Sequence, residues 1–202
     1  MILKPSLRSR LMPMPVVFIS TISKEGIRNI APWGCVMPVL RPLDLICIAS
    51  AKKRDTLVNI RETRVFVLNM PGVDMADKVI PTARFSSPEV DEFEVAGLGE
   101  KPSTIVMAPG IAGCYAWMEC ELHKEYEEKD HVLIVGKVLR IEVADDVLRP
   151  DGSLDAEKAR PLMMMSGEKG MGFCTVCDIN KFEPFSAMFP DGRDPLAREQ
   201  ED

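Results

Sequence analysis

Long hydrophobic runs are missing from this sequence of 202 residues. Its longest apolar stretches are short, for example VVFI and LICIA. A helix that crosses a membrane needs about 18 or more consecutive apolar residues, so we expect no membrane-spanning segment and no membrane partner. Pro5, Pro13 and Pro15 interrupt the N-terminal segment, which therefore does not match the apolar region of a signal peptide. We expect a mature cytoplasmic chain.

Basic residues are also in the minority, because 25 Lys and Arg stand against 31 Asp and Glu, a formal net charge of -6. The isoelectric point near 5.1 follows from this excess of acid. General binding of nucleic acid requires a broad cationic face that neutralises phosphates, so we expect no nucleic-acid partner. Any basic binding site must be local.

Several motifs of well-known sites are absent as well. The sequence has no Walker-type phosphate loop and no Gly-x-Gly-x-x-Gly after a strand, which disfavours nucleotide hydrolysis and a Rossmann dinucleotide site. One Cys-x-x-Cys occurs, at Cys174 and Cys177, without a second Cys or His pair at a spacing that suits zinc. We expect no metal site, and we expect the six cysteines to be reduced.

What the sequence does contain is a series of short strand patterns. Residues 15–23 are rich in β-branched side chains and turn at Gly26 into residues 27–31, which predicts a hairpin. Further strands are expected at residues 43–50, 64–70, 114–126 and 131–143, and short helices at 56–63, 73–85 and 153–165. These elements predict one domain over residues 1–202, a mainly antiparallel small β-barrel with a polar tail from about residue 189.

Three of these segments carry finer expectations. Residues 116–122 alternate between apolar and charged, so Glu119 and His123 are expected on an exposed polar face. Asp55 is expected to be the N-cap of the helix that follows it. Pro161 is expected to interrupt the last predicted helix, because proline cannot continue the hydrogen-bond ladder.

The stretch SAKKRDT, residues 50–56, places three consecutive cations in an acidic chain. It lies between a predicted strand and a predicted helix, where free N–H groups and the helix dipole favour an anion. The hydroxyls of Ser50 and Thr56 and the ammonium groups of Lys52 and Lys53 complete the donor set of a phosphate cradle. The alternative interpretation is a solvated charged surface.

Upstream, the segment RNIAPWGCV, residues 28–36, combines an amide, small residues, a proline and an indole at the end of the predicted hairpin. Such a segment can lay backbone N–H and C=O groups along the edge of a flat heterocycle. Taken alone, Trp33 would more often be a core or interface aromatic. The surrounding motif favours the ligand-binding interpretation.

These two segments, followed by ARF at residues 83–85 and DHVLIVGKV at 130–138, resemble the flavin reductase-like family of FMN-binding split barrels, which includes the flavoredoxins. The resemblance extends over residues 10–180 and rests on several motifs in the same order. It implies an antiparallel, Greek-key-like split β-barrel with a few short helices. It also implies a homodimer that binds FMN non-covalently near the dimer interface.

The resemblance further implies which residues bind FMN. It assigns to the edge of the isoalloxazine ring Asn29, Ala31, Pro32 and Trp33. It assigns to the phosphate-binding loop Ser50, Lys52, Lys53, Asp55 and Thr56. The sequence departs from its relatives at Gly34, where Ser is common, so a side-chain hydroxyl contact is lost there.

More distant residues complete this implied site. Arg84 and Phe85 match a basic–aromatic pair that reaches the phosphate or the ring. His131 matches a histidine near the flavin and the nicotinamide pocket, although a histidine there is equally compatible with a plain exposed position. Phe173 or Cys174 is expected to touch the ring or to cap the pocket.

The activity that the resemblance implies is transfer of electrons from NADH or NADPH, through FMN, to free flavin or to a redox protein partner. Hydride transfer to FMN needs no side-chain acid or base, so no catalytic residue is expected. One alternative is a flavoredoxin-like electron carrier that does not use NAD(P)H directly. Another is a non-catalytic dimeric barrel whose basic loop binds a different phosphate compound.

Overall fold

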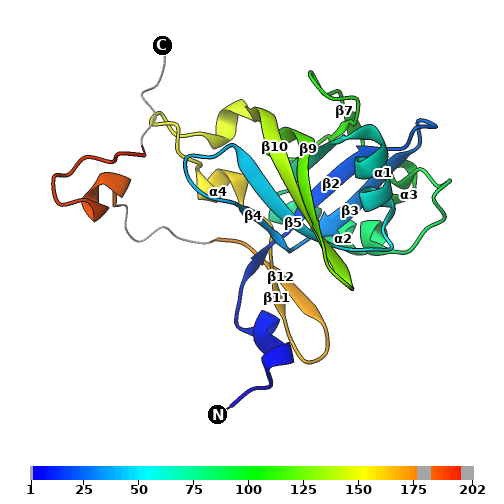
Figure 1. The fold of residues 1–202 in the computed structure, drawn as a ribbon, viewed down its shortest axis with the longest axis horizontal. Helices are drawn as coiled ribbons and strands as arrows, with labels where there is room; N and C mark the ends of the chain where they lie inside the picture. Colours follow the sequence, from blue (N-terminus) through cyan, green and yellow to red (C-terminus); the bar gives the residue numbers. More distant parts are fainter. Residues whose placement is uncertain (1, 177–182, 197–202) are drawn as a thin grey trace.

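A seven-stranded antiparallel sheet, in the order β3-β2-β6-β9-β10-β5-β4, forms the centre of the protein (Figure 1). The computed structural model describes residues 2–176 and 183–196. The strands of this sheet are β2 (Val17–Ile22), β3 (Arg28–Trp33), β4 (Val36–Pro38), β5 (Leu45–Ala51), β6 (Val65–Met70), β9 (Ala116–Glu127) and β10 (His131–Val143). The prediction of a mainly antiparallel β fold is confirmed.

The sheet curls because its two edge strands are neighbours in the chain. β3 pairs with β2 and β4 pairs with β5, and only Gly34 and Cys35 separate β3 from β4. The Cys35 carbonyl accepts a hydrogen bond from the Ala49 N–H at 3.0 Å, so the chain passes here from one edge of the sheet to the other. Among the described residues, the outer edge of β3 has no strand partner.

α1 (Asp55–Thr63) joins β5 to β6 and packs against β2 and β3. Its Leu57 and Ile60 are fully buried in the main core, where they meet Ile19 of β2 and Phe66 of β6. Burying an aliphatic side chain of this size is worth about 1.5–3 kcal/mol. The helix is therefore held firmly at the open side of the curled sheet.

The start of α1 differs from the sequence prediction. Asp55 is the first helical residue, and Arg54 occupies the N-cap position in an extended conformation without a side-chain capping bond. The prediction for Asp55 is wrong by one position, because the Arg54 carbonyl already accepts from the N–H groups of Leu57 and Val58 at 3.0 and 3.2 Å. The N-terminus of α1 is left without a side-chain cap, which favours an anion there.

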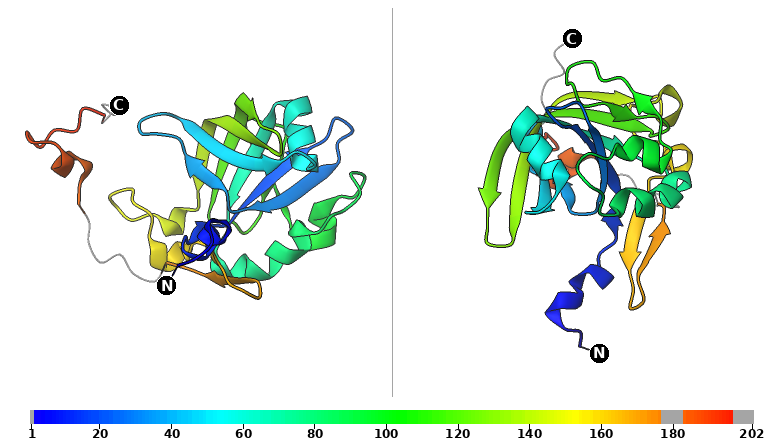
Figure 2. Two further views of the ribbon diagram at one scale, coloured as in Figure 1. Left: turned by 60° about the horizontal axis from the view of Figure 1, so that its bottom comes forward. Right: turned by 90° about the vertical axis from the view of Figure 1, so that its right-hand side faces the viewer.

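A second core lies on the opposite face of β3, under α2 (Ala76–Ala83) and α3 (Glu92–Ala96). It contains Phe18, Ile30 and Phe93. A small sheet of β1 (Met14–Pro15), β11 (Met163–Ser166) and β12 (Met171–Cys174) contributes Met164 and Phe173 to it. The β11–β12 hairpin projects from the barrel beside the N-terminal segment (Figures 1 and 2).

The remaining elements are short. They are η1 (Pro5–Arg10), η2 (Val73–Met75), β7 (Glu100–Lys101), β8 (Gly110–Ile111), η3 (Asp145–Val147), α4 (Ala156–Ala159) and η4 (Phe185–Met188). In the part of the chain that the structure describes, no helix has the length and apolar character that crossing a membrane requires.

The helix expected over residues 153–165 is only partly present. α4 ends at Ala159, and Arg160 then adopts a positive φ of 43°. Pro161 interrupts the helix as predicted, but the methionines after it form β11 rather than more helix. The reason is tertiary, because β11 finds strand partners in β1 and β12.

Glu119 also departs from the prediction, because it is only 3% exposed rather than lying on an open polar face. Its carboxylate accepts three backbone N–H bonds, from Thr104, Ile105 and Val106, at 2.9, 2.6 and 2.9 Å. Arg140 donates to the same carboxylate at 3.3 Å. The loop that covers this face of β9 buries Glu119, whereas His123 is exposed as predicted.

Candidate functional site

Seven of the predicted site residues line one small pocket between β3, the start of α1 and the end of α2. These are Asn29, Ala31, Lys53, Asp55, Thr56, Arg84 and Phe85, and the pocket also includes Arg54, Thr82, Ser86 and Glu92. We call it the cationic pocket. Its volume of about 40 Å³ suits one small group rather than a whole cofactor.

Two cations of this pocket have no ion-pair partner among the described residues. Lys53 and Arg84 form no ion pair with any residue that the structure describes, and Arg54 stacks on the Phe85 ring at 4.7 Å. The exposed Phe85 thereby holds the Arg54 guanidinium in place. Together with the uncapped N-terminus of α1, these groups favour an anion in this pocket.

Lys52 differs from its neighbour Lys53. Its ammonium group pairs with Glu127 of β9 at 2.7 Å, outside the cationic pocket. The same Glu127 also pairs with Arg61 at 3.1 Å. Of the two lysines predicted to bind phosphate, the structure therefore brings only Lys53 to the site.

A buried hydrogen-bond network forms the floor of the cationic pocket. Asn29 is its centre, because its Oδ1 accepts from Thr56 at 2.9 Å and from Thr21 at 3.3 Å. The Asn29 Nδ2 donates to Glu92 at 2.5 Å. Asn59 of α1 donates to the Thr21 hydroxyl at 3.0 Å. The Asn29 side chain thus connects β3 to α1 and to Glu92, and its predicted contact with a flavin ring stays a prediction.

Glu92 in α3 is a site residue that the sequence did not reveal. Its carboxylate accepts from the Ile30 N–H at 2.9 Å and so occupies the outer edge of β3 in place of a strand. Burial raises the pKa of Glu92, and the bond from Ile30 opposes this rise only in part. In the sequence it reads as an ordinary acidic residue at a helix start, so no local pattern could have identified it.

An apolar pocket continues the site along β3. It has a volume of about 180 Å³ and is lined by Pro32, Trp33 and Gly34 together with Val16, Val79, Ile80, Ala83, Met164 and Met171. The indole N–H of Trp33 is buried and has no hydrogen-bond partner among the described residues. A flat aromatic ligand suits these walls, because the pocket offers mainly apolar surface beside the backbone of β3.

Four predicted residues line neither pocket: Lys52, which pairs with Glu127, and the three described next. Ser50 is buried, and its hydroxyl donates to the Ala51 carbonyl at 2.9 Å. His131 is exposed at the start of β10, where it pairs with Ala51. Phe173 pairs with Met164 in the β11–β12 hairpin and packs on the second core. Cys174 is partly buried in the same hairpin, and Cys177 lies outside the described residues.

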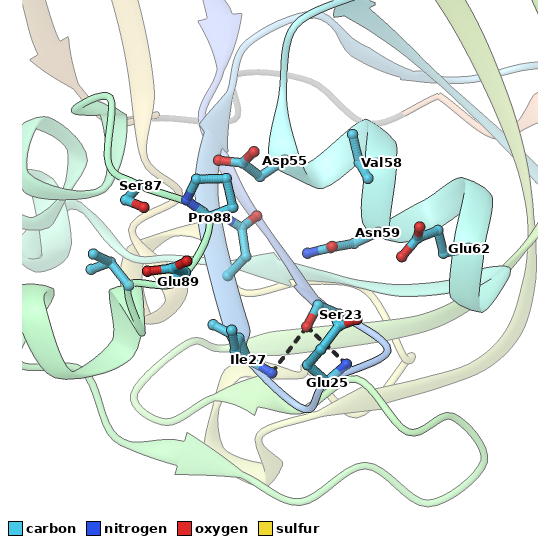
Figure 3. Close-up of a pocket in the computed structure, with 12 residues that line it drawn as sticks. Ser23, Glu25, Ile27, Asp55, Val58, Asn59, Glu62, Ser87, Pro88 and Glu89 are labelled. Atoms are coloured by element: carbon cyan, nitrogen blue, oxygen red, sulfur yellow. Dashed lines mark hydrogen bonds between the residues drawn. The ribbon is translucent and has the colours of Figure 1, made fainter.

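A larger pocket of about 420 Å³ lies beside the cationic pocket and shares Asn29 and Asp55 with it. Figure 3 shows Asp55 and Glu62 projecting from α1 on one side and Glu89 from the facing loop on the other. Its lining has four carboxylates, with Glu25 as the fourth, and no cation. This charge disfavours phosphate in the larger pocket, whereas the cations of the cationic pocket favour it. No carboxylate, thiol and imidazole cluster suited to a metal occurs in the described ranges.

The fold is a split barrel with a cationic pocket at a helix N-terminus and an adjoining apolar pocket, an arrangement that suits a phosphorylated, flat ligand. Residues 8–170 match the family model described as "Flavin reductase like domain". The chain therefore belongs to the flavin reductase-like family, a flavin-binding family, and the predicted family is confirmed.

Individual proteins agree with this assignment. A protein from Methanothermobacter thermautotrophicus that has no described function is 64% identical over 202 residues, which cover 98% of this chain and 95% of the relative. Flavoredoxin of Desulfovibrio vulgaris (Miyazaki F) superposes with a TM-score of 0.81 at 21% identity, over 93% of this chain and 100% of that one. The FMN-binding protein from Thermus thermophilus superposes with a TM-score of 0.72 at 20% identity, over 91% of this chain and 97% of that one. These structures confirm the split-barrel fold.

Proposed function

We propose that this protein is an FMN-dependent oxidoreductase that takes hydride from NADH or NADPH and delivers electrons to free flavin or to a redox protein. One observation carries the proposal. The cationic pocket and the apolar pocket lie next to each other along β3, the first with unpaired cations and the second with apolar walls. FMN combines a phosphate with a flat ring and therefore matches this pair of pockets.

Different residues of the site would bind the phosphate and the ring of FMN. Lys53, Arg84 and the N–H groups that begin α1 would hold the phosphate. The backbone of Pro32 to Gly34 and the side chains of α2 would enclose the ring and exclude water. Bound FMN would supply the hydride-accepting chemistry, which needs no acid or base from the protein.

Flavin binding can be tested with substitutions in the loop before α1 and in the loop after α2. Purified protein should bind FMN, seen as a change in the visible flavin absorption bands during titration. Lys53→Ala and Arg84→Ala should each weaken FMN binding about tenfold or more, the scale of one charge-assisted contact. Lys52→Ala is the matched control, because Lys52 pairs with Glu127 outside the pocket and should leave FMN affinity nearly unchanged.

A comparison of ligands separates the two pockets. Riboflavin has the same ring without the phosphate, so it should bind more weakly than FMN to the wild-type protein. Lys53→Ala should bind riboflavin as well as the wild-type protein does. Equal affinity of the wild-type protein for FMN and riboflavin would contradict the assignment of the phosphate to the cationic pocket.

A flavoredoxin-like electron carrier is the second candidate, favoured by the similarity of fold to flavoredoxin. A reductase oxidises NADH or NADPH in the steady state when free flavin is added. A carrier binds FMN but shows no such oxidation above background. Measuring this rate with purified protein decides between the two.

The proposal includes a homodimer in the cytoplasm that meets a redox protein partner. Exposed apolar side chains on β4, at the β4–β5 connection and on β10 support an interface between copies; they are Met37, Leu40, Leu43 and Ile141. Light scattering on purified protein tests this, and a monomeric mass at micromolar concentration would exclude the dimer.

A further inference from the structure

Glu92 places a carboxylate inside a pocket that otherwise suits an anion. The side chain is 8% exposed and lines the cationic pocket with Lys53, Arg54 and Arg84. Its Oε2 accepts both the Ile30 N–H at 2.9 Å and the Asn29 Nδ2 at 2.5 Å. A phosphate held by the same cations would therefore stand near a buried carboxylate of the same sign.

Several charged groups surround Glu92 on the elements packed against it. They are Lys53, Arg54 and Asp55 at the start of α1, Arg84 after α2, Arg28 on β3 and Asp91 at the N-cap of α3. Lys78 of α2 points elsewhere, because its ammonium group donates to the Ala96 carbonyl at 3.2 Å. Arg28 forms ion pairs with Asp91 at 2.6 Å and with Glu100 at 2.9 Å. The cations available to a phosphate are therefore Lys53, Arg54 and Arg84, which line the same pocket as Glu92.

We propose that Glu92 takes up a proton from solvent when a phosphate group binds in the cationic pocket, so that anion binding there is linked to protonation. The proton comes from the buffer and is held on the carboxyl group, with no other bond made or broken. Protonation removes the repulsion between the two anions while Oε2 still accepts from Ile30 and Asn29. The proposal rests on the proposed function, because FMN supplies the phosphate.

The surroundings of Glu92 already favour its protonated form before any anion binds. Burial already raises the pKa of Glu92 above its ordinary value of 4.5, and the nearby Asp55 and Asp91 add to the rise. A second negative charge in the pocket raises it further. Each unit of rise on binding corresponds to a tenfold difference in phosphate affinity between the protonated and ionised protein.

Glu92→Gln separates charge from structure. The glutamine oxygen can accept the same two hydrogen bonds, so β3 and Asn29 stay anchored while the titrating charge disappears. Glu94→Gln is the matched control, because Glu94 lies in the same helix with its side chain 79% exposed and does not line the pocket. Circular dichroism and a melting temperature for each variant establish that it is folded.

Calorimetric titration with FMN between pH 5 and pH 8, in two buffers of different ionisation enthalpy, counts the protons taken up. The wild-type protein and Glu94→Gln should take up more protons than Glu92→Gln, the FMN phosphate contributing equally to all three. The affinity of Glu92→Gln should exceed that of the wild-type protein by about tenfold at pH 8 and approach it at pH 5.

Equal proton counts and parallel affinity profiles for Glu92→Gln and the wild-type protein would overturn the proposal, and so would weaker binding by Glu92→Gln at every pH. If the wild-type protein does not bind FMN at all, the proposed function fails by itself. The same titrations with inorganic pyrophosphate then decide the role of Glu92. Absence of pyrophosphate binding overturns the proposal as well.

Discussion

Asn29 shows how one buried side chain can organise the wall of a pocket through its hydrogen bonds. Its amide uses both its oxygen and its nitrogen on protein partners, namely Thr21, Thr56 and Glu92. A buried amide with satisfied hydrogen bonds rigidifies its surroundings, whereas an unsatisfied one costs about 1–3 kcal/mol. Substitutions around Asn29 should therefore affect stability and FMN binding together.

Thr56→Val tests this network at the scale of one hydroxyl. Thr56 is 1% exposed and donates to Asn29, so valine keeps the shape but removes the donor. The free energy of unfolding should fall by about 1–2 kcal/mol, measured by urea denaturation. Thr56→Ser, which keeps the donor, should lose clearly less. The same loss in both variants would show that packing of the methyl group, not the hydrogen bond, matters.

Glu119 allows a pH-dependent prediction at the same scale. Burial alone would raise the pKa of Glu119, but the three N–H groups of residues 104–106 and Arg140 outweigh it and lower the pKa below its ordinary value of 4.5. A lowered pKa in the folded state contributes stability above the unfolded value, and that stability is lost as the pH falls through the folded value.

Glu119→Gln should accordingly lower the free energy of unfolding by about 1.5–3 kcal/mol at pH 7, because glutamine has one fewer acceptor for the loop. The difference from the wild-type protein should shrink as the pH falls below 4.5. Glu121→Gln on the same strand is the control. A difference between wild type and Glu119→Gln that does not change with pH would contradict the role of the charge.

At the scale of the element, the junction of β3 with α1 decides where the site lies. β3 supplies the apolar pocket and part of the cationic pocket, and α1 supplies Lys53 to Thr56 from its first turn and the loop before it. The two elements are far apart in the sequence and meet because Leu57 and Ile60 bury in the core of the curled sheet. The position of the loop before α1 therefore depends on packing in that core.

The strand β10 contains a glycine that this packing requires. A Cβ on Gly136 would lie 2.4 Å from the Cζ atom of Phe66, a fully buried aromatic of β6. Gly136→Ala should lower the free energy of unfolding by about 1–3 kcal/mol, the usual cost of overpacking a core, and thermal denaturation measures it. Gly172→Ala in β12 is the control, because no atom lies within 4 Å of its added Cβ. Equal melting temperatures for both variants would contradict this account.

At the scale of the whole molecule, two cores on opposite faces of β3 hold the site between them. The main core lies inside the curled sheet, and the second lies under α2 and α3. The cationic pocket opens between elements that belong to different cores, since α1 packs on the first and α2 on the second. A ligand bound there connects the two halves of the protein.

FMN should therefore raise the melting temperature of the whole chain. At a free concentration one hundred times its dissociation constant, a ligand of the folded state adds about 2.7 kcal/mol to the free energy of unfolding. A thermal-shift titration should show one cooperative transition that moves upward with FMN concentration and moves less in Arg84→Ala. Two separate transitions, only one of which responds to FMN, would contradict coupling of the two cores by the ligand.

The sequence predicted six of the seven strands of the large sheet and the helix after the cationic run, because these depend on local patterns. Alternating and β-branched residues specify strands, and adjacent cations before a helix specify an anion site. The predictions were wrong where contacts between distant segments determine the secondary structure or the burial of a residue. The methionines after Pro161 pair with β1 and β12, and Glu119 receives its partners from a loop that ends ten residues or more before it.

The sequence by itself determined the class of fold, the family motifs and a local cationic run in an acidic chain. Only the tertiary structure decided that Lys53 enters the site while Lys52 pairs with Glu127, and that Asn29 is a structural centre. It also placed Glu92 among the cations. The physical reason is that the charge of a side chain follows from its residue type and its direction from its place in a helix or strand. Its partners depend on which distant elements the two cores bring together.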